Sequence, residues 1–175
     1  TDTSNPDRTP VMNINGGTSD SSRTYLGSSD ASGNYSPRTA TFDAKGASGL
    51  YGGGNSKTTP IMGCNDQVAN AGYWTVDGLR FTGFSFWAFH VSASPGGGVN
   101  VHNWTIQNCE FFGGSGRYLT NASGVNLAPL VIYTAYNGLV TNNYFHDNEG
   151  WTDPDHFSAV YQCGESTSTH DIVYT

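Results

Sequence analysis

The chain has 175 residues, with 7 Lys and Arg against 14 Asp and Glu, so its net charge is −7. This acidic balance disfavours a nucleic-acid-binding protein, which needs a basic surface. Aromatic residues make up 13% of the chain and charged residues only 12%, a composition that argues against intrinsic disorder. No stretch approaches the roughly 20 apolar residues of a membrane span, so the sequence predicts no membrane insertion.

Residues 1–60 contain only brief candidate strands between loops. The runs 10–14 and 40–42 are rich in β-branched or aromatic residues, whereas Gly and Ser dominate the stretches around them. We therefore expect 1–60 to be an irregular, strand-poor segment that leads into a regular repeat over 61–175.

The repeat is the most informative feature of the sequence. Residues 74–81, 104–111 and 138–145 align with one another, and 170–174 begins a fourth copy. A second apolar strand is expected between successive copies, at 84–91, 130–136 and 157–163. One such unit cannot bury its apolar face alone, but a stack of coils can.

Stacking predicts which residues become neighbours. The apolar anchors recur after 30, 34 and 32 residues and are expected to form one inward ladder in a parallel sheet: Val76, Ile106, Val140 and Ile172. A second ladder is expected from Phe81, Phe111 and Phe145. Asn108 and Asn142 fall at one turn position, where we expect their side chains to turn inward and hydrogen-bond along the stack.

An Ile or Val, then an Asn, then a Phe, recurring about every thirty residues, resembles the right-handed parallel β-helix proteins. These include pectate-lyase-like and chondroitinase-like polysaccharide lyases, several glycoside hydrolases and bacteriophage tailspikes. The resemblance covers about residues 61–175, with the stretch from Tyr73 to Gly83 especially similar to an early coil. It implies an all-β, right-handed parallel β-helix, a polysaccharide as partner, and an extracellular, secreted or virion-associated location.

The densest polar cluster lies at residues 146–156, in a region without basic residues. Residues 118–175 hold six acidic residues and no Lys or Arg, so their partner is expected to be neutral, cationic or bridged by a metal. Glycoside hydrolysis needs two carboxylates, which Glu149 and either Asp153 or Asp155 can supply. Trp151 can stack on a sugar ring.

Two other interpretations of this cluster stay open. The loop can be a solvated acidic turn without a ligand. It can also hold a cation, since carboxylate oxygens suit Ca²⁺ and the pair His146 and His156 suits a transition metal. The calcium candidates are Asp147, Glu149, Asp153 and Asp155. If the loop is a sugar site, we expect the two histidines to bind the substrate.

Lyase chemistry is a further possibility that the resemblance raises, because such enzymes commonly use an Arg or Lys base. Arg80 and Arg117 are the basic residues of the clear coils. Arg80 is expected one coil from Glu110 at the same outward position, with Tyr144 following. An ion pair between Arg80 and Glu110 is the simpler interpretation.

A binding function without catalysis is the alternative. The candidate groove on the outside of the coils would be lined by aromatic residues, namely Trp87, Trp151, Tyr133, Tyr136 and Tyr161. Because strand residues alternate between faces, we expect about half of these to be buried instead. A bacteriophage tailspike, a fibre or a cell-surface structural protein would use such a groove to bind glycans.

Two remaining features concern covalent and subunit structure. Cys64, Cys109 and Cys163 are odd in number and sparse, which does not indicate a disulfide framework. The fourth repeat stops before its Asn and Phe, and an exposed strand edge needs a cover. We therefore expect further chain, or a partner subunit such as the neighbour in a homotrimer, to cap this coil.

Overall fold

The computed structural model describes residue 10 and residues 12–44, 60–65, 68–84, 87–92, 101–114, 128–148, 158–163 and 169–175. Regular structure in these residues is strand, apart from one short 3₁₀ turn, η2 (Asp20–Ser22). Within the same ranges, no helix is long and apolar enough to cross a membrane.

The strands form three sheets in which all neighbours run parallel. Sheet A contains β1 (Met12–Asn13), β4 (Met62–Asn65), β7 (Phe89–Ser92), β10 (Leu130–Tyr133) and β13 (Val160–Cys163). Sheet B contains β2 (Thr24–Gly27), β5 (Gly72–Asp77), β8 (Val101–Gln107), β11 (Ala135–Thr141) and β14 (His170–Tyr174). Sheet C contains β3 (Thr41–Asp43), β6 (Arg80–Thr82), β9 (Glu110–Phe112) and β12 (Tyr144–His146).

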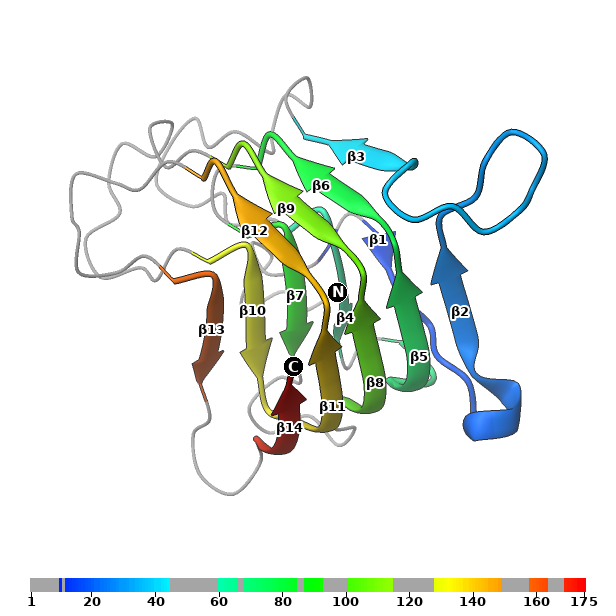
Figure 1. Cartoon of the computed structure of the whole chain (residues 1–175). Coiled ribbons are helices and arrows are strands. Elements are labelled where there is room, and N and C mark those ends of the chain that lie inside the picture. The colour runs from blue at the N-terminus through cyan, green and yellow to red at the C-terminus, as the bar shows by residue number, and fades with distance from the viewer. Residues whose placement is uncertain are drawn as a thin grey trace.

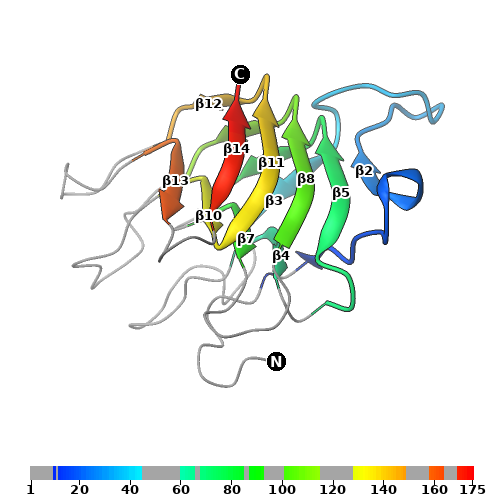
Figure 2. The same cartoon turned by 90° about the horizontal axis from the view of Figure 1, so that it is seen from below.

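The chain visits sheets A, B and C in turn, so that each visit to all three makes one coil (Figures 1 and 2). The first coil is β1-β2-β3, the second β4-β5-β6, the third β7-β8-β9 and the fourth β10-β11-β12, after which β13 and β14 begin a fifth. This all-β arrangement of stacked parallel strands is compatible with a parallel β-helix. The predicted second strands correspond to β7, β10 and β13, each shorter than predicted, and residues 135–136 already belong to β11 of sheet B.

The predicted aliphatic ladder is confirmed for three of its four residues. Val76 pairs with Ile106 and Ile106 with Val140, and all three are buried. The placement of the fourth residue was wrong, because Ile172 pairs with Gly138 and Tyr174 pairs with Val140. A shift of two residues keeps the same side chains on the same face of a strand, so Ile172 still packs against the core.

The register at Gly138 has a visible cause. Trp74 and Trp104 occupy equivalent positions in adjacent coils and their rings stack, with centroids 5.7 Å apart. Gly138 is the next residue in this column. A Cβ at Gly138 would lie 2.1 Å from the Trp104 ring, so the absence of a side chain there makes room for the indole.

The phenylalanine ladder is confirmed and is longer than predicted. Phe81, Phe111 and Phe145 pair in register, with ring centroids 5.1 and 4.9 Å apart. Phe42 of β3 precedes them, with its ring 5.6 Å from that of Phe81. The first coil therefore contributes to a stack that the sequence assigned only to later coils.

The bends between strands are built from residues with left-handed backbone conformation. Gly78, Asn108 and Asn142 form one column, with φ of 68°, 55° and 51°. Glycine and asparagine tolerate this conformation best. A second column lies within the strands of sheet B and consists of Tyr73, Asn103, Asn137 and Asp171. A third column follows the strands of sheet C and consists of Gly83, Gly113 and Asp147.

The asparagine prediction was right about hydrogen bonding and wrong about direction. The Asn142 Nδ2 donates to Asn108 Oδ1 at 2.6 Å, which makes the predicted contact along the stack. Asn142 is exposed, however, and does not turn inward. The next residue, Asn143, makes the inward contacts, since its amide accepts from the Cys109 N–H and donates to the Ile106 carbonyl, both at 2.9 Å.

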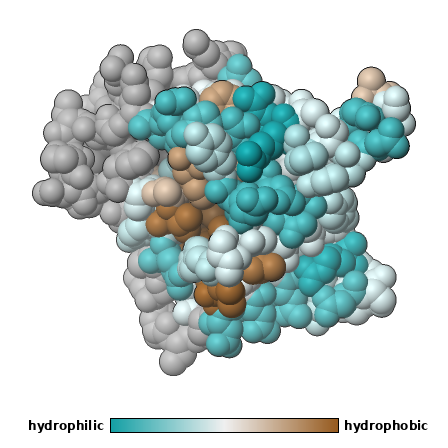
Figure 3. Space-filling model, viewed as in Figure 1, coloured by the Kyte–Doolittle hydropathy of each residue, from teal (hydrophilic) through white to brown (hydrophobic). Residues whose placement is uncertain are grey.

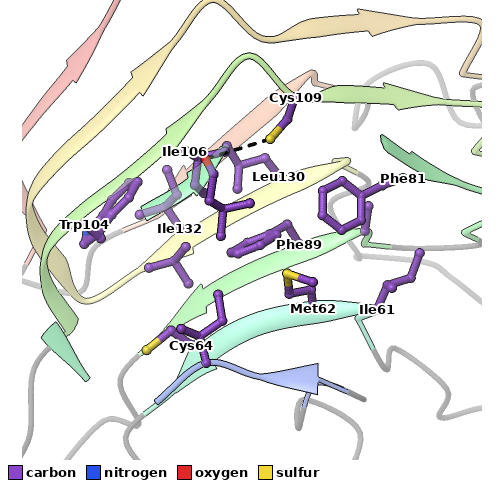
Figure 4. Close-up of a cluster of buried hydrophobic side chains, with 14 of the residues drawn as sticks. Ile61, Met62, Cys64, Phe81, Phe89, Trp104, Ile106, Cys109, Leu130 and Ile132 are labelled. Carbon is purple, nitrogen blue, oxygen red and sulfur yellow. Dashed lines mark hydrogen bonds between the residues drawn. The ribbon is translucent and has the colours of Figure 1, made fainter. Parts of the chain in front are cut away.

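Apolar side chains fill the space enclosed by the coils, while much of the visible surface is hydrophilic (Figure 3). The close-up shows side chains from all three sheets meeting in this core (Figure 4). Cys64 and Cys109 lie within it as free thiols. Burial raises the pKa of each thiol to about 12, so neither is a nucleophile at neutral pH.

Candidate functional site

The loop after β12 holds most of the predicted catalytic residues, but only its first residues are described. His146 ends β12, and Asp147 and Asn148 follow it. The other predicted residues of this loop lie outside the described part of the chain: Glu149, Trp151, Asp153, Asp155 and His156. Their convergence on a substrate or on Ca²⁺ therefore stays a prediction.

The surface that leads into this loop is the outer side of sheet C. Because the phenylalanine ladder points inward, the residues on either side of it point outward. Strand pairing arranges them in two rows, Arg80–Glu110–Tyr144 and Thr82–Phe112–His146. We call these six residues the sheet C face.

Glu110 is the centre of the sheet C face. The Arg80 Nε donates to Glu110 Oε2 at 2.8 Å, and His146 Nε2 lies 2.8 Å from Oε1. The predicted ion pair between Arg80 and Glu110 is thus confirmed. Although burial opposes the effect, hydrogen bonds from His146 and Arg80 hold the pKa of Glu110 below its ordinary value. Glu110 is therefore a carboxylate at neutral pH and unsuited to act as a general acid.

His146 lies between two carboxylates. Its Nδ1 is 2.8 Å from Asp147 Oδ2, and its Nε2 faces Glu110 at the same distance. Hydrogen bonds to Asp147 and Glu110 raise the pKa of His146. Both ring nitrogens can donate at once only when the imidazole is protonated, so this geometry favours the imidazolium form.

Planar groups of the sheet C face lie against one another. The His146 ring stacks on Tyr144, with centroids 4.2 Å apart, and is nearly parallel to Phe112 at 5.4 Å. The Arg80 guanidinium lies 4.6 Å from the centre of the Phe112 ring. Tyr144 is 50% exposed, so one ring of this series is open to solvent.

The other predicted aromatic residues do not lie on one surface. Tyr133 and Tyr161 belong to sheet A, where their ring centroids are 6.0 Å apart and both pack against a small outer cluster that includes buried Trp87. Tyr136 belongs to sheet B and stacks on His102 at 5.4 Å. The predicted groove is thus divided between two sheets.

A polar cluster on the outside of sheet B was not predicted. The buried Asp77 carboxylate accepts four side-chain hydrogen bonds: Tyr35 and Asn108 donate to Oδ1 at 2.6 and 2.8 Å, and Tyr25 and Gln107 to Oδ2 at 2.5 and 2.8 Å. Burial opposes ionisation, yet these four bonds hold the pKa of Asp77 below its ordinary value. We call these five residues the Asp77 cluster. Two of its members, Tyr25 and Tyr35, come from the first coil, where the sequence shows no clear repeat that would connect them to Asp77.

Most of the predicted cation ligands lie outside the described part of the chain. Among the described residues, no group of three His, Cys, Asp or Glu side chains is placed to hold a metal ion. Asp147, the one calcium candidate among them, has a side chain that is 84% exposed and bonded to His146.

Comparison with known proteins does not assign this chain to a family. A scan against protein-family models finds no match, and neither do searches of curated proteins and of solved structures.

Proposed function

We propose that this chain is a right-handed parallel β-helix that binds a polysaccharide across the sheet C face and cleaves it with the acidic loop after β12. The winding through three parallel sheets supports the fold. Connections between parallel strands of one sheet are almost always right-handed, because a right-twisted strand packs back onto its sheet only that way.

The observation that carries the function is the composition of the sheet C face beside the start of the acidic loop. A sugar ring has a flat apolar side and a rim of hydroxyl groups. The half-exposed Tyr144 ring offers an apolar plane, and Arg80 and Glu110 offer a fixed donor and acceptor next to it. His146 belongs to this surface and directly precedes the loop.

The charge of the C-terminal region supports a neutral polysaccharide. Residues 118–175 carry six acidic and no basic side chains apart from histidine. An anionic uronate chain would be repelled there unless a cation such as Ca²⁺ intervened. A neutral sugar also lacks the carboxylate that a lyase needs next to the proton it removes, so hydrolysis is the reaction that fits this substrate.

The acidic loop would supply the two carboxylates of that hydrolysis. One carboxylic acid protonates the leaving oxygen, and the other carboxylate either activates water or attacks the sugar carbon. We assign these roles to Glu149 and one of Asp153 and Asp155, with Trp151 as a wall of the site. His146 and His156 would contact the substrate.

The test combines binding and cleavage. Native gels containing dextran, galactomannan or laminarin should retard the protein, whereas gels containing alginate or polygalacturonate should not. Tyr144→Ala should reduce the retardation, and Tyr174→Ala is the matched control because Tyr174 is similarly exposed but lies on sheet B. Glu149→Gln should abolish the release of new reducing ends without changing retardation.

The outcomes separate the two function classes. Retardation without any cleavage by the wild type would establish a non-enzymatic binding protein, such as a bacteriophage fibre or a cell-surface protein, in place of the enzyme. A wild type that binds none of these polysaccharides would overturn the carbohydrate function altogether.

A further inference from the structure

We propose that the Asp77 cluster is a second glycan-binding surface, which extends the sheet C face around the bend between sheets B and C. Its ligand would be the neighbouring part of the same neutral polysaccharide. This inference rests on the proposed function and adds a subsite to it.

The two tyrosines of the cluster are exposed and held in place. Tyr25 and Tyr35 are 55% and 52% exposed, yet both hydroxyl groups donate to the same carboxylate, that of Asp77. The Tyr25 ring lies over Gly27, where a Cβ would meet it at 2.4 Å. Rings fixed in this way lose little conformational entropy when a ligand stacks on them.

The cluster presents little free charge. The Asp77 carboxylate is buried, and all four of its hydrogen bonds come from uncharged side chains of the cluster. A cationic ligand therefore finds no free carboxylate there, and an anionic ligand finds a net negative charge. The Gln107 amide donates one N–H to Asp77 and carries a second N–H and a carbonyl, which suit the adjacent hydroxyl groups of a sugar. On the side of β5 and β2 the visible surface is mostly hydrophilic, which fits a polar ligand (Figure 3).

A continuous series of contacts joins this cluster to the sheet C face. Asn108 Nδ2 also lies 3.2 Å from the Tyr35 hydroxyl. The Asn108 carbonyl accepts from Arg38 Nε at 3.0 Å, and the Arg38 guanidinium lies 5.9 Å from the centre of the Tyr144 ring. Exposed Asn142 lies beside Asn108 in the same column. Exposed rings thus occur on both sides of one bend, with amides and a guanidinium between them.

A polymer long enough to cross the bend would contact Tyr144 and the two N-terminal tyrosines together. A short oligosaccharide would reach only one of the two surfaces. Because linked contacts act together, the affinity for a long chain should depend on both surfaces and that for a short chain on one.

The experiment uses the full chain and the neutral polysaccharide that retards it most, in two size fractions. The double variant Tyr25→Ala/Tyr35→Ala removes both rings, and Tyr25→Phe/Tyr35→Phe keeps the rings while removing the hydroxyl groups. Isothermal titration with the long fraction should show at least fivefold weaker binding by the alanine variant, because both rings on which the ligand stacks are removed. The phenylalanine variant should lose less affinity than the alanine variant.

A merely structural role gives a different pattern. Both double variants lose the bonds to Asp77, so both are expected to melt at lower temperature; affinities are therefore compared well below the lower melting temperature. Equal affinity of the wild type and the alanine variant for the long fraction would overturn the second surface, while leaving the proposed function intact. A wild type that binds neither size fraction would instead overturn both the second surface and the proposed function. Binding of a proline-rich peptide, but of no glycan, to Tyr25 and Tyr35 would also overturn the inference.

Discussion

The first coil and the later coils are held in the stack by different interactions. In the second to fourth coils, equivalent aromatic or aliphatic residues stack directly, as Phe81 does on Phe111. The first coil adds Phe42 to that ladder but depends strongly on polar side chains. Arg23 donates to the Trp74 and Asn103 carbonyls at 3.0 and 2.9 Å.

Arg38 repeats this arrangement at the neighbouring bend. It donates to the main-chain carbonyls of Asn108 and Asn142, at 3.0 and 3.3 Å. This first-coil side chain therefore contacts the third and the fourth coil. The Asp77 cluster adds a third polar attachment of the same segment. Where the sequence repeat is clear, apolar columns align the coils. Where it is not, long polar side chains connect to main-chain carbonyls of sheet B and of the bend that follows it.

The largest difference in stability between variants of the first coil and of the later coils should appear in the phenylalanine ladder. Phe111 is fully buried between two stacked rings, so Phe111→Ala should destabilise the protein by about 3–5 kcal/mol. Phe42 is only partly buried and contacts one ring of the ladder, so Phe42→Ala should cost clearly less. Urea denaturation measures both, and equal losses would show that the first coil is packed like the others.

The polar attachment should be sensitive to the shape of the arginine as well as to its charge. Arg38→Ala removes two charge-assisted hydrogen bonds and is expected to cost about 1.5–3 kcal/mol. Arg38→Lys keeps the charge but cannot reach both carbonyls with one planar group, so its loss should be intermediate. Hydrogen exchange should show the loss of protection concentrated in residues 12–44, and a uniform loss would contradict the comparison.

The bends offer a smaller and more specific test. Asn142 has φ of 51°, a conformation that costs an alanine about 1–2 kcal/mol and glycine almost nothing. Asn142→Ala should therefore lower the melting temperature, whereas Asn142→Gly should nearly preserve it despite losing the bond to Asn108. If the two variants melt alike, the hydrogen bond rather than the backbone conformation determines the choice of asparagine.

These differences also explain how much the sequence could predict. Val76, Ile106 and Val140 were aligned correctly because burial repeats at a constant position in each coil. Ile172 was misplaced because its copy lacks the Asn and Phe that fix the alignment, and an alternating pattern tolerates a shift of two. The first coil was missed as a coil, since its connections to Asp77 and to the bend carbonyls depend on residues with no periodic spacing.

The same reasoning applies to the candidate site. The pairing of Arg80 with Glu110 followed from the repeat, because both occupy the outward position before a ladder phenylalanine. The contacts of His146 with Asp147 and Glu110 could not be predicted from the repeat, because they depend on side-chain conformations at the end of β12. Within one coil, residues with left-handed conformation recur every five positions, as Asn103, Asn108 and Gly113 do. This spacing of Asn and Gly was a signal in the sequence that would have located the bends.

The smallest expected effect is the pH dependence of the sheet C face. The pKa of His146 is raised in the folded state above its ordinary 6.5, because its ring donates to Asp147 and Glu110. The stabilisation from this histidine is therefore complete below about pH 6.5 and is lost as the pH rises through the raised value.

Glu110 has the opposite sign. Its pKa is lowered from 4.5 in the folded state, so its stabilisation is present above that pH and is lost as the pH falls through the lowered value. The groups that face His146 are Asp147, Glu110 and the rings of Tyr144 and Phe112, with Arg80 on the far side of Glu110. Thermal melts should therefore show that His146→Gln is destabilising at pH 5.5 and nearly neutral at pH 9. Arg38→Ala should destabilise the protein equally at both values, and a His146→Gln loss that does not change with pH would show that the imidazole is neutral in the folded protein.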